Sequence, residues 1–343
     1  MITLKKEMNT IIKGVGHYVP ENIVTNDDLA QIMDTNDEWI QERTGIKERR
    51  HVGRNGNEPT SILGFKAAEK AIANAGIDKH DIDFIIFATL SPDLYFPGCG
   101  VQLQDYLGLK PIGALDVRNQ CSGFVYALST AHAYVKSGMY KNILVVGAEN
   151  HSFGLDMTTR GRGVSVIFGD GAGAVIVGAS DEENRGILSC NMHSEGQYAE
   201  ELTMQFPGTK YGWVDNLLKD NFEIDKEKIY PYMNGNFVFK HAVTRFPEAI
   251  REAFDDADEK IENLKILIPH QANLRISQFV QKQMNLRDDQ VFNNIQKYGN
   301  TTAGSIPIAL SEAVASGRIQ KGDLVCIAAF GSGFTWGSVL FRF

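Results

Sequence analysis

The stretch Leu115-Asp116-Val117-Arg118-Asn119-Gln120-Cys121-Ser122-Gly123-Phe124 decides the fold of this chain. Residues 113–117 are typical of a strand, and a helical pattern starts directly after Cys121 and ends at Gly138. A thiol in a strand-to-helix turn lies at a helix N-terminus, where unpaired N–H groups and the helix dipole favour the thiolate. The stretch therefore predicts a reactive cysteine in an α/β fold. The alternative is that Cys121 is a small buried apolar residue.

Two other segments have the same form. In residues 267–275 an apolar strand runs into Pro269-His270-Gln271-Ala272-Asn273 and a further helix, and in residues 297–307 Asn300 precedes a helix of small residues. Each has a structural interpretation, with His270 as a satisfied strand-end histidine and Asn300 as a helix cap. A Cys, a His and an Asn that each end an apolar strand suit the carboxyl edge of a layered α/β sheet, where active sites collect.

Composition limits the class of protein. With 343 residues and 43% hydrophobic content, the chain can bury a large core, as one domain or as two fused halves. Its apolar runs are too short to cross a bilayer, and its start lacks the apolar core of a signal peptide. The four cysteines show neither CxxC pairing nor metal-ligand spacing, so we expect no metal and a cytoplasmic setting. The net charge of −8 argues against nucleic acid.

Strand-like and helix-like segments alternate along the chain, which predicts a layered α/β fold. Residues 166–177 and 328–340 both read as a strand, a glycine turn and a returning strand, and each closes one half of the chain. The two segments hint at a duplication, with one half at 1–182, which carries Cys121, and the other at 183–343, which carries His270 and Asn300. The long polar stretch at 194–232 either covers a site or is surplus.

Together these segments resemble β-ketoacyl-acyl-carrier-protein synthase III, a condensing enzyme of the thiolase superfamily, from about residue 11 to residue 343. The landmarks are residues 37–46 (DEWIQERTGI), 168–174 (FGDGAGA), the Cys121 turn, 269–273 (PHQAN), 299–301 (GNT) and 329–337 (AFGSGFTWG). The resemblance implies the five-layer αβαβα thiolase-like fold, with two sheets packed on a shared pair of helices.

The resemblance also implies a reaction. Cys121 attacks an acyl-CoA thioester, and decarboxylation of a malonyl group on an acyl carrier protein then gives an enolate that attacks the acyl-enzyme. His270 and Asn300 would donate to the enolate oxygen, and the backbone N–H groups of Cys121 and Ser332 would form a second oxyanion hole. No cofactor is expected, since acyl-CoA and malonyl-carrier protein are substrates. Residues 331–333 are Gly-Ser-Gly, whereas the family more commonly has Gly-Gly-Gly there. The Cβ of Ser332 is expected to narrow the site or restrict the backbone.

Further positions match the family's binding residues. Trp39, Arg43 and Arg162 correspond to the CoA site, where an aromatic surface stacks on adenine and guanidinium groups bind phosphate. The alternatives are that Trp39 anchors the core and that Arg43 pairs with Glu38 or Glu42. Gly235, Phe239 and Asn273 correspond to the pantetheine channel.

Phe96 corresponds to a segment that crosses a dimer interface in the family and closes the acyl pocket of the other subunit, so a homodimer is expected. The alternative is a core phenylalanine. No glutamate of the hydroxymethylglutaryl-CoA-synthesising type is evident near Phe96, and Asp93 is the nearby acid to examine.

An acyl carrier protein is acidic, so an enzyme of net charge −8 must meet it through a local basic patch. By resemblance, Lys240, Arg275 and Lys282 occupy the carrier-docking positions, and Arg245 and Arg251 on the helix of Lys240 extend the patch. The alternative is that these are ordinary solvated charges.

The leading function is thus β-ketoacyl-acyl-carrier-protein synthase III activity that initiates fatty acid biosynthesis. The alternative is a relative that uses longer acyl-CoA primers or serves a specialised quinolone or polyketide pathway, as the 194–232 stretch, Ser332, and Tyr298 in place of a common His suggest. A non-catalytic carrier-binding or scaffold subunit is a third possibility, against which the complete set of Cys121, His270 and Asn300 speaks.

Overall fold

Two β-sheets lie on either side of a shared pair of helices in the computed structural model, which describes residues 9–52, 56–210 and 225–343. The first sheet has the strand order β1-β7-β6-β4-β5 and the second β11-β12-β13-β8. The strands of the first sheet are β1 (Asn9–Tyr18), β4 (Phe84–Ala88), β5 (Gly113–Val117), β6 (Asn142–Glu149) and β7 (Gly171–Ser180). Those of the second are β8 (Gly186–Ser194), β11 (Ile266–Pro269), β12 (Leu324–Gly331) and β13 (Thr335–Arg342).

The two sheets repeat one pattern of pairing. Along β4-β6-β7-β1 the first pair is parallel and the next two are antiparallel. Along β11-β12-β13-β8 the same order recurs. The expectation of two similar halves is thus confirmed for the fold. The boundary at residue 182 falls in the connection between β7 and β8, and the halves as separate domains stay a prediction.

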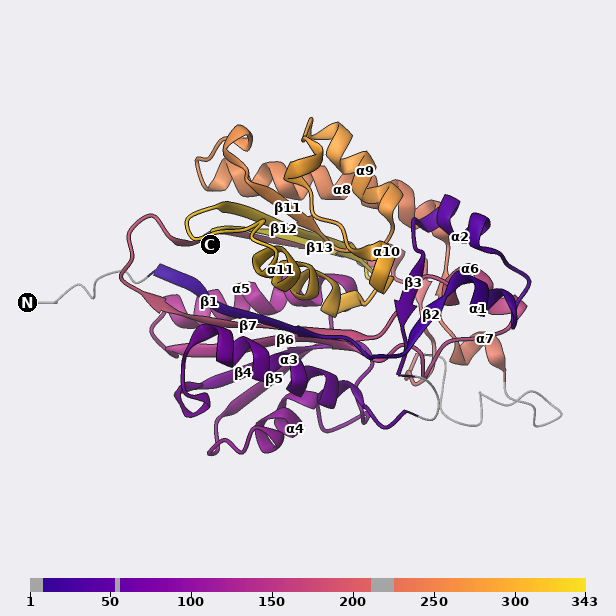
Figure 1. Ribbon diagram of the computed structural model, residues 1–343, viewed down its shortest axis with the longest axis horizontal. Helices are drawn as coiled ribbons and strands as arrows, with labels where there is room; N and C mark the ends of the chain where they lie inside the picture. The colour runs from indigo at the N-terminus through magenta and orange to yellow at the C-terminus, as the bar shows by residue number, and fades with distance from the viewer. Residues whose placement is uncertain (1–8, 53–55, 211–224) are drawn as a thin grey trace, which may run out of the picture.

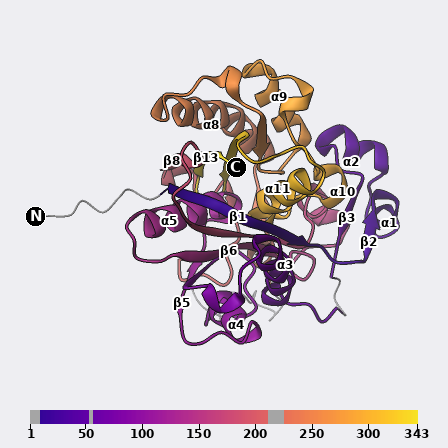
Figure 2. The ribbon, with the colours of Figure 1, turned by 60° about the vertical axis from the view of Figure 1, so that its left-hand side comes forward.

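Helices form the other three layers of the described structure (Figure 1). The central layer holds α5 (Gly123–Lys136) and α11 (Ser305–Ala315), whose residues are largely buried because a sheet covers each side. Outside the first sheet lie α3 (Thr60–Ala75) and α4 (Cys99–Tyr106), and outside the second lie α8 (Gly235–Asp256) and α9 (Leu274–Gln283). Figure 2 shows the same order from another side. The layers are those of the αβαβα fold.

Smaller elements gather at one end of the layers, at the right in Figure 1. They are β2 (Ile23–Thr25), α1 (Asn26–Ala30), α2 (Asp37–Thr44), β3 (Glu48–Arg50), α6 (Arg162–Ser165), β9 (Leu202–Thr203), α7 (Lys226–Ile229), β10 (Tyr232–Met233) and α10 (Ile295–Tyr298). The prediction of a strand at residues 166–168 is wrong, because α6 and a turn precede β7 there; only residues 328–340 form two strands around a turn. Of the helices described, none is long and apolar enough to cross a membrane.

Candidate active site

Cys121 lies in a 3₁₀ turn, Gln120–Ser122, between β5 and α5. The strand and the helix predicted around it are therefore both present. Gln120 has a φ of 45°, which is uncommon for a residue with a side chain and marks a tight turn. The cysteine is buried, with 8% of its surface exposed. The turn thus presents a largely dry thiol at the start of a central helix.

Two backbone N–H groups, from residues far apart in the sequence, lie near the Cys121 sulfur. The N–H groups of Ser332 and of Cys121 itself face the sulfur and lower its pKa. A Cβ built on Gly331 would lie 2.4 Å from the Cys121 Cβ and 3.0 Å from its Sγ, so β12 comes this close because residue 331 has no side chain. Among the described residues, Ser332 is not one of those with positive φ, so its Cβ causes no backbone strain. The backbone at residue 332 is thus unstrained, and the expected narrowing of the site by the Ser332 Cβ stays a prediction.

The protonation state of Cys121 departs from the sequence prediction. Burial raises the pKa of the thiol to about 12 and the nearby Glu149 carboxyl adds to this, while the N–H groups of Ser332 and Cys121 oppose it. Burial therefore outweighs the helix N-terminus, and Cys121 rests as a thiol. Its proton must leave during the attack on a thioester.

Gly331→Ala is expected to slow acylation of Cys121 by about 10²-fold, because a Cβ so close to the cysteine displaces either the sulfur or the N–H of residue 332. The rate is measured by quenching single turnovers with acyl-CoA and weighing the enzyme. The matched control is Gly154→Ala, whose Cβ meets open space. Acylation of the Gly331 variant at the rate of the control would show that the close approach is unimportant.

His270 directly follows β11 and is 3% exposed. Its Nδ1 lies 2.6 Å from the Ser305 hydroxyl, which also accepts the Gln271 N–H at 3.4 Å. Where the Ser305 hydroxyl donates to Nδ1, the neutral ring carries its proton on Nε2. Burial lowers the pKa of His270 to about 3, so the ring is neutral. Nε2 is buried with no hydrogen-bond partner in the part of the chain described.

Asn300 is buried and held by its backbone. Its N–H donates to Ile167 O at 2.8 Å and its carbonyl accepts the Gly169 N–H at 3.1 Å, in a bridge with Phe168. The prediction that Asn300 ends a strand is wrong, because the short helix α10 precedes it. The side-chain Oδ1 accepts the Thr302 N–H at 2.8 Å. The amide NH₂ is thus the end of the side chain that can donate to a ligand.

One short segment brings the three candidates together. The 3₁₀ turn Thr302–Gly304 packs against the Gln120–Ser122 turn that carries Cys121. Asn300 lies just before this segment, and Ser305, the partner of His270, lies just after it. A nucleophile, two side chains that can donate hydrogen bonds and two backbone N–H groups therefore lie on neighbouring segments.

Sequence reasoning missed two buried residues of this site. Glu149 ends β6 and accepts from the Thr89 and Ser91 hydroxyls at 3.0 and 2.5 Å, and burial raises its pKa to about 7. Its position could have been noticed in the sequence, because Glu149 is an acidic residue at the end of an otherwise apolar strand. His151 lies 2.7 Å from the Thr302 hydroxyl through Nε2, and so supports the turn beside Asn300. No comparable signal marks His151, which follows a strand end by two residues.

The buried histidines predict a loss of stability in acid. Burial, the first cause, lowers the pKa of His151 and of His270 to about 3, against about 6.5 in an unfolded chain. Below pH 6.5 these two histidines are protonated in the unfolded chain but stay neutral in the folded protein. Each histidine therefore lowers the free energy of unfolding by about 1.4 kcal/mol for every pH unit below 6.5. Between pH 7.5 and 5.5, His151→Gln should thus lose about 1 kcal/mol less than wild type in urea titrations. Exposed His80→Gln is the control, and an unchanged loss in the His151 variant would contradict the account.

The predicted CoA residues cluster around Trp39. The Arg43 guanidinium lies 4.4 Å and that of Arg162 5.3 Å from the centre of the Trp39 ring. Trp39 is half-buried and packs against a hydrophobic cluster that includes Ile40 and Val166, so it also anchors the core locally. The described residues include no ion pair of Arg43 with Glu38 or Glu42. Arg162 also contacts Asp34 at 3.2 Å. An aromatic ring between guanidinium groups suits an adenine ring and phosphates.

The predicted channel residues fall on two neighbouring helices. Gly235 starts α8, which also carries Phe239, and the Arg275 guanidinium of α9 lies 5.7 Å above the Phe239 ring. Asn273 caps α9 by accepting the Arg275 N–H at 2.9 Å, and its amide donates to Arg43 O at 2.9 Å. Asn273 therefore links α9 to the CoA cluster, and the contacts of all three with pantetheine stay predictions.

Phe96 is 81% exposed and Tyr95 beside it 58%, so the alternative of a core phenylalanine is wrong. Asp93 accepts from the Ser61 N–H at 3.0 Å and from the Ser61 hydroxyl, at the start of α3. Its carboxyl is thus occupied in supporting that helix.

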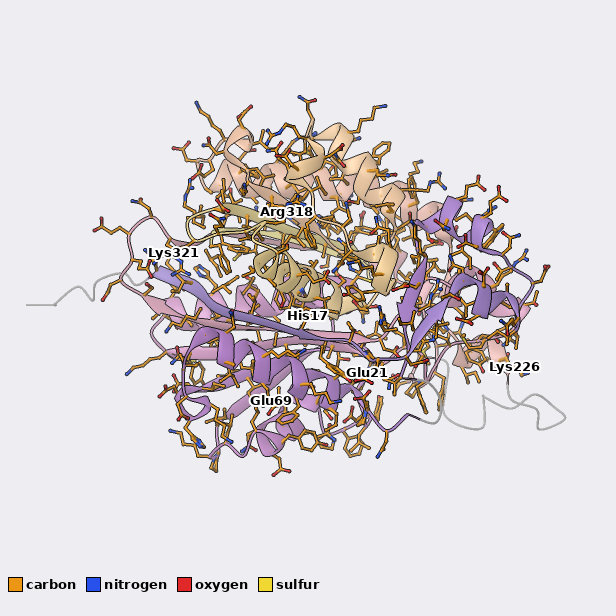
Figure 3. The ribbon with its side chains drawn as sticks, viewed as in Figure 1. His17, Glu21, Glu69, Lys226, Arg318 and Lys321 are labelled. Carbon is orange, nitrogen blue, oxygen red and sulfur yellow. The ribbon has the colours of Figure 1, made fainter. Side chains whose placement is uncertain are left out.

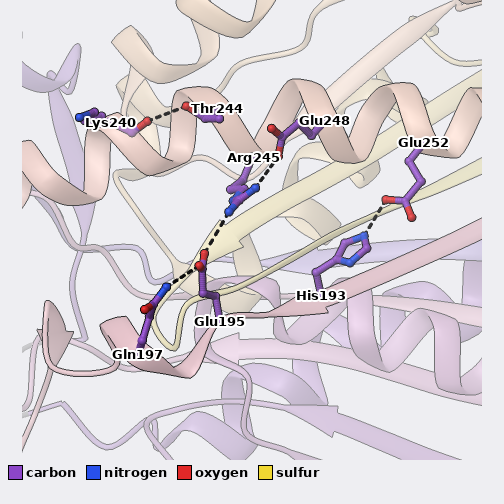
Figure 4. A network of polar contacts seen from close by, with 8 residues as sticks. All are labelled: His193, Glu195, Gln197, Lys240, Thr244, Arg245, Glu248 and Glu252. Atoms are coloured by element: carbon purple, nitrogen blue, oxygen red, sulfur yellow. Dashed lines mark hydrogen bonds and ion pairs between the residues drawn. The ribbon is translucent and has the colours of Figure 1, made fainter.

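The predicted docking residues Lys240, Arg275 and Lys282 are exposed on α8 and α9, and no ion pair holds them among the described residues. Arg245 differs. It pairs with Glu195 at 3.1 Å and with Glu248 at 2.9 Å, as Figure 4 shows. The expectation that Arg245 extends the patch is wrong, because two carboxylates already neutralise it. Arg251 is exposed.

The described part of the 194–232 stretch forms a ribbon of β9 and β10, in which Thr203 pairs with Tyr232 and Leu202 with Met233. The ribbon, α6 and α7 enclose a cavity of about 580 Å³ lined by Asp156, Arg160, Glu200, Tyr230 and Tyr232 among others. Lys226, labelled in Figure 3, lies in the same lining. None of Cys121, His270 and Asn300 lines this cavity, so the choice between a covering and a surplus segment stays a prediction. Residues 211–224 of the stretch lie outside the described residues.

Comparisons with known proteins place this site in a family. Residues 115–196 match the family model 3-oxoacyl-[acyl-carrier-protein] synthase III, and residues 254–343 match its C-terminal model. β-Ketoacyl-[acyl-carrier-protein] synthase III of Serratia proteamaculans is 45% identical over 336 residues, which cover 98% of this chain and 100% of that protein.

Solved structures agree with these matches. The 3-oxoacyl-[acyl-carrier-protein] synthase III of Aquifex aeolicus superposes with a TM-score of 0.88 at 42% identity, covering 97% of this chain and 100% of the other. The priming β-ketosynthase of the R1128 polyketide pathway superposes with a TM-score of 0.88 at 30% identity, covering 99% and 98%. The chain therefore belongs to the β-ketoacyl-acyl-carrier-protein synthase III family of the thiolase superfamily.

Proposed function

We propose that this acyltransferase joins an acyl-CoA starter to malonyl-acyl carrier protein by decarboxylative Claisen condensation, and so initiates fatty acid biosynthesis. The observation that carries the proposal is the buried, unpartnered Nε2 of His270, which directly follows β11 beside β12, the strand whose Gly331 meets Cys121. A buried donor without a partner is costly unless a ligand completes it. An enolate oxygen is such a ligand.

In the first half-reaction the Cys121 sulfur attacks the thioester carbonyl and the N–H groups of Cys121 and Ser332 hold the oxyanion. The bond from carbon to the CoA sulfur then breaks, and the thiol proton leaves with CoA. The acyl group stays on Cys121. Because one thioester replaces another, this step is close to neutral in energy.

In the second half-reaction the bond between the malonyl carboxylate and its methylene carbon breaks, and its electron pair forms the enolate. His270 Nε2–H and the Asn300 amide stabilise the enolate oxygen. The enolate carbon bonds to the acyl carbon, and the Cys121 sulfur leaves and regains a proton. Release of CO₂ drives the step forward. The roles of the residues, and the absence of a cofactor, stay predictions.

The binding partners follow from the surface. Trp39 with Arg43 and Arg162 would hold the adenine and phosphates of CoA. Lys240, Arg275 and Lys282 would meet the acidic carrier protein. The exposed Phe96 and its neighbours form an apolar surface that supports a homodimer in which Phe96 reaches the partner's acyl pocket. The cytoplasmic setting is likewise a prediction.

The identity values favour initiation over a specialised pathway, since the synthase III from Serratia is 45% identical and the polyketide priming enzyme 30%. Incubation with malonyl-carrier protein and a ladder of acyl-CoAs, from acetyl to dodecanoyl, tests this. We expect acetoacetyl-carrier protein from acetyl-CoA. Product from the longer primers alone would contradict the initiating role, and no product from any primer would contradict condensation.

Arg275→Glu is expected to raise the KM for malonyl-carrier protein about tenfold while the KM for acyl-CoA stays unchanged, because a reversed charge at a docking surface repels an acidic partner. Steady-state kinetics with each substrate varied in turn give the two constants. Lys141→Glu makes the same change of charge at an exposed residue away from α8 and α9. Equal rises in both KM values for the Arg275 variant would contradict docking.

A further inference from the structure

Ser332 makes a contact that a glycine at this position could not make. Its hydroxyl donates to Leu202 O at 2.5 Å. Leu202 belongs to β9, which pairs with β10 and thereby connects to the start of α8. The bond therefore joins the loop beside Cys121 to the ribbon of the 194–232 stretch.

The other side of Ser332 is held as well. Its carbonyl accepts from the Thr335 hydroxyl at 3.0 Å, and the Thr335 hydroxyl lies 2.6 Å from that of Ser122. When Thr335 donates to Ser332 O it accepts from Ser122, and a line of hydrogen bonds then runs from the residue after Cys121 to residue 332; in this arrangement the Ser122 hydrogen no longer points to Asn119 O, 3.0 Å away. Ser332 thus has its side chain fixed to the ribbon and its carbonyl fixed to the Cys121 turn.

The group between these two attachments is the Ser332 N–H, which follows Gly331 at the point where a Cβ on Gly331 would lie 3.0 Å from the Cys121 Sγ, and which lowers the pKa of that thiol. The ribbon itself is anchored on the far side of Leu202. The Asn234 N–H donates to Glu201 O at 2.8 Å and its amide donates to the Glu201 carboxylate at 2.9 Å. Glu195 and Phe334 exchange backbone hydrogen bonds of 2.8 and 2.9 Å where the stretch leaves β8. The position of the Leu202 carbonyl is therefore held by hydrogen bonds of the neighbouring residues.

We propose that the Ser332 hydroxyl is a positioning group for acyl transfer: by donating to Leu202 O it holds the Ser332 N–H on Cys121, and it makes the β9–β10 ribbon part of the oxyanion hole. The proposal rests on the proposed function, since it concerns the rate of Cys121 acylation. The hydroxyl itself touches no reacting atom.

The chain offers matched variants for a test. Ser332→Ala removes the hydroxyl and keeps the N–H, Ser332→Thr keeps both, and Thr335→Val removes the attachment of the Ser332 carbonyl. The control is Ser316→Ala, which removes a comparable bond from a serine to a carbonyl, Glu312 O at 2.8 Å, at the far end of α11. Single-turnover acylation at several acyl-CoA concentrations separates the rate constant from the half-saturating concentration.

We expect Ser332→Ala and Thr335→Val each to lower the acylation rate constant about tenfold, since a misplaced oxyanion donor costs less than the 10²- to 10³-fold of a missing one. The half-saturating concentration should stay within about twofold, because the CoA contacts are untouched. Ser332→Thr and Ser316→Ala should react like wild type.

A lower melting temperature of Ser332→Ala with an unchanged acylation rate constant would overturn the proposal, because the bond would then be structural only. An equal loss in Ser332→Thr and Ser332→Ala would overturn it too, since the threonine retains the hydroxyl. These failures differ from that of the proposed function, in which wild type itself would form no acyl-Cys121 with any acyl-CoA.

Discussion

Cys121→Ala is expected to lower acyl transfer by about 10⁴-fold or more, because it removes the atom that forms the covalent intermediate. No other thiol can replace it. Cys99 and Cys326 are fully buried, and Cys190 lies on β8 rather than in the turn beside Ser332. The change only shortens a buried side chain, so the fold and the Trp39 cluster should persist.

The measurement pairs mass spectrometry after incubation with acyl-CoA and calorimetry of CoA binding. The variant should show no acyl adduct and bind CoA with wild-type affinity. Cys190→Ala, at a half-buried thiol, is the control and should acylate normally. Substantial turnover by the Cys121 variant would show that the acyl group passes by another route.

Asn300→Ala and His270→Ala are expected to spare acylation and to slow condensation about 10²- to 10³-fold each, the usual cost of one donor in an oxyanion hole. The selectivity follows from geometry. The Cys121 sulfur is approached by the N–H groups of Cys121 and Ser332, whereas His270 Nε2 has no partner in the described structure until an oxygen arrives. Acylation and condensation therefore use different donors.

When the enzyme is acylated beforehand and then mixed with malonyl-carrier protein, the measured rate is that of condensation alone. Release of CO₂ should slow with product formation in both variants. Because the pKa of His270 is lowered to about 3, that rate should not change between pH 6 and 8 through this ring. Condensation at the wild-type rate by Asn300→Ala would contradict the enolate role assigned to it.

The sequence alone predicts those features of the structure that depend on residues close together in the chain. The Cys121 turn is set by a strand on one side and a helical pattern on the other, and β5 and α5 lie at the predicted residues. The repeated halves came mainly from the family resemblance, because residues 166–168 do not form the strand that the apparent repeat required. Family resemblance supplied the chemical roles, which neither composition nor spacing could supply.

Long-range contacts account for the differences. Asn300 is held by Ile167 and Gly169, residues far away in sequence, so a short helix could precede it instead of the expected strand. Glu149 is buried because Thr89 and Ser91 of another strand end satisfy it. Arg245 is neutralised by Glu195, fifty positions away. No local pattern encodes such partners.

The most direct test of the central claim is the intact mass of the enzyme before and after malonyl-carrier protein is added to protein treated with acyl-CoA. The account predicts one acyl group per chain, mapped to Cys121, which disappears as β-ketoacyl-carrier protein and CO₂ form in equal amounts. An acyl group on another residue, or an acyl-Cys121 that persists while product accumulates, would contradict it.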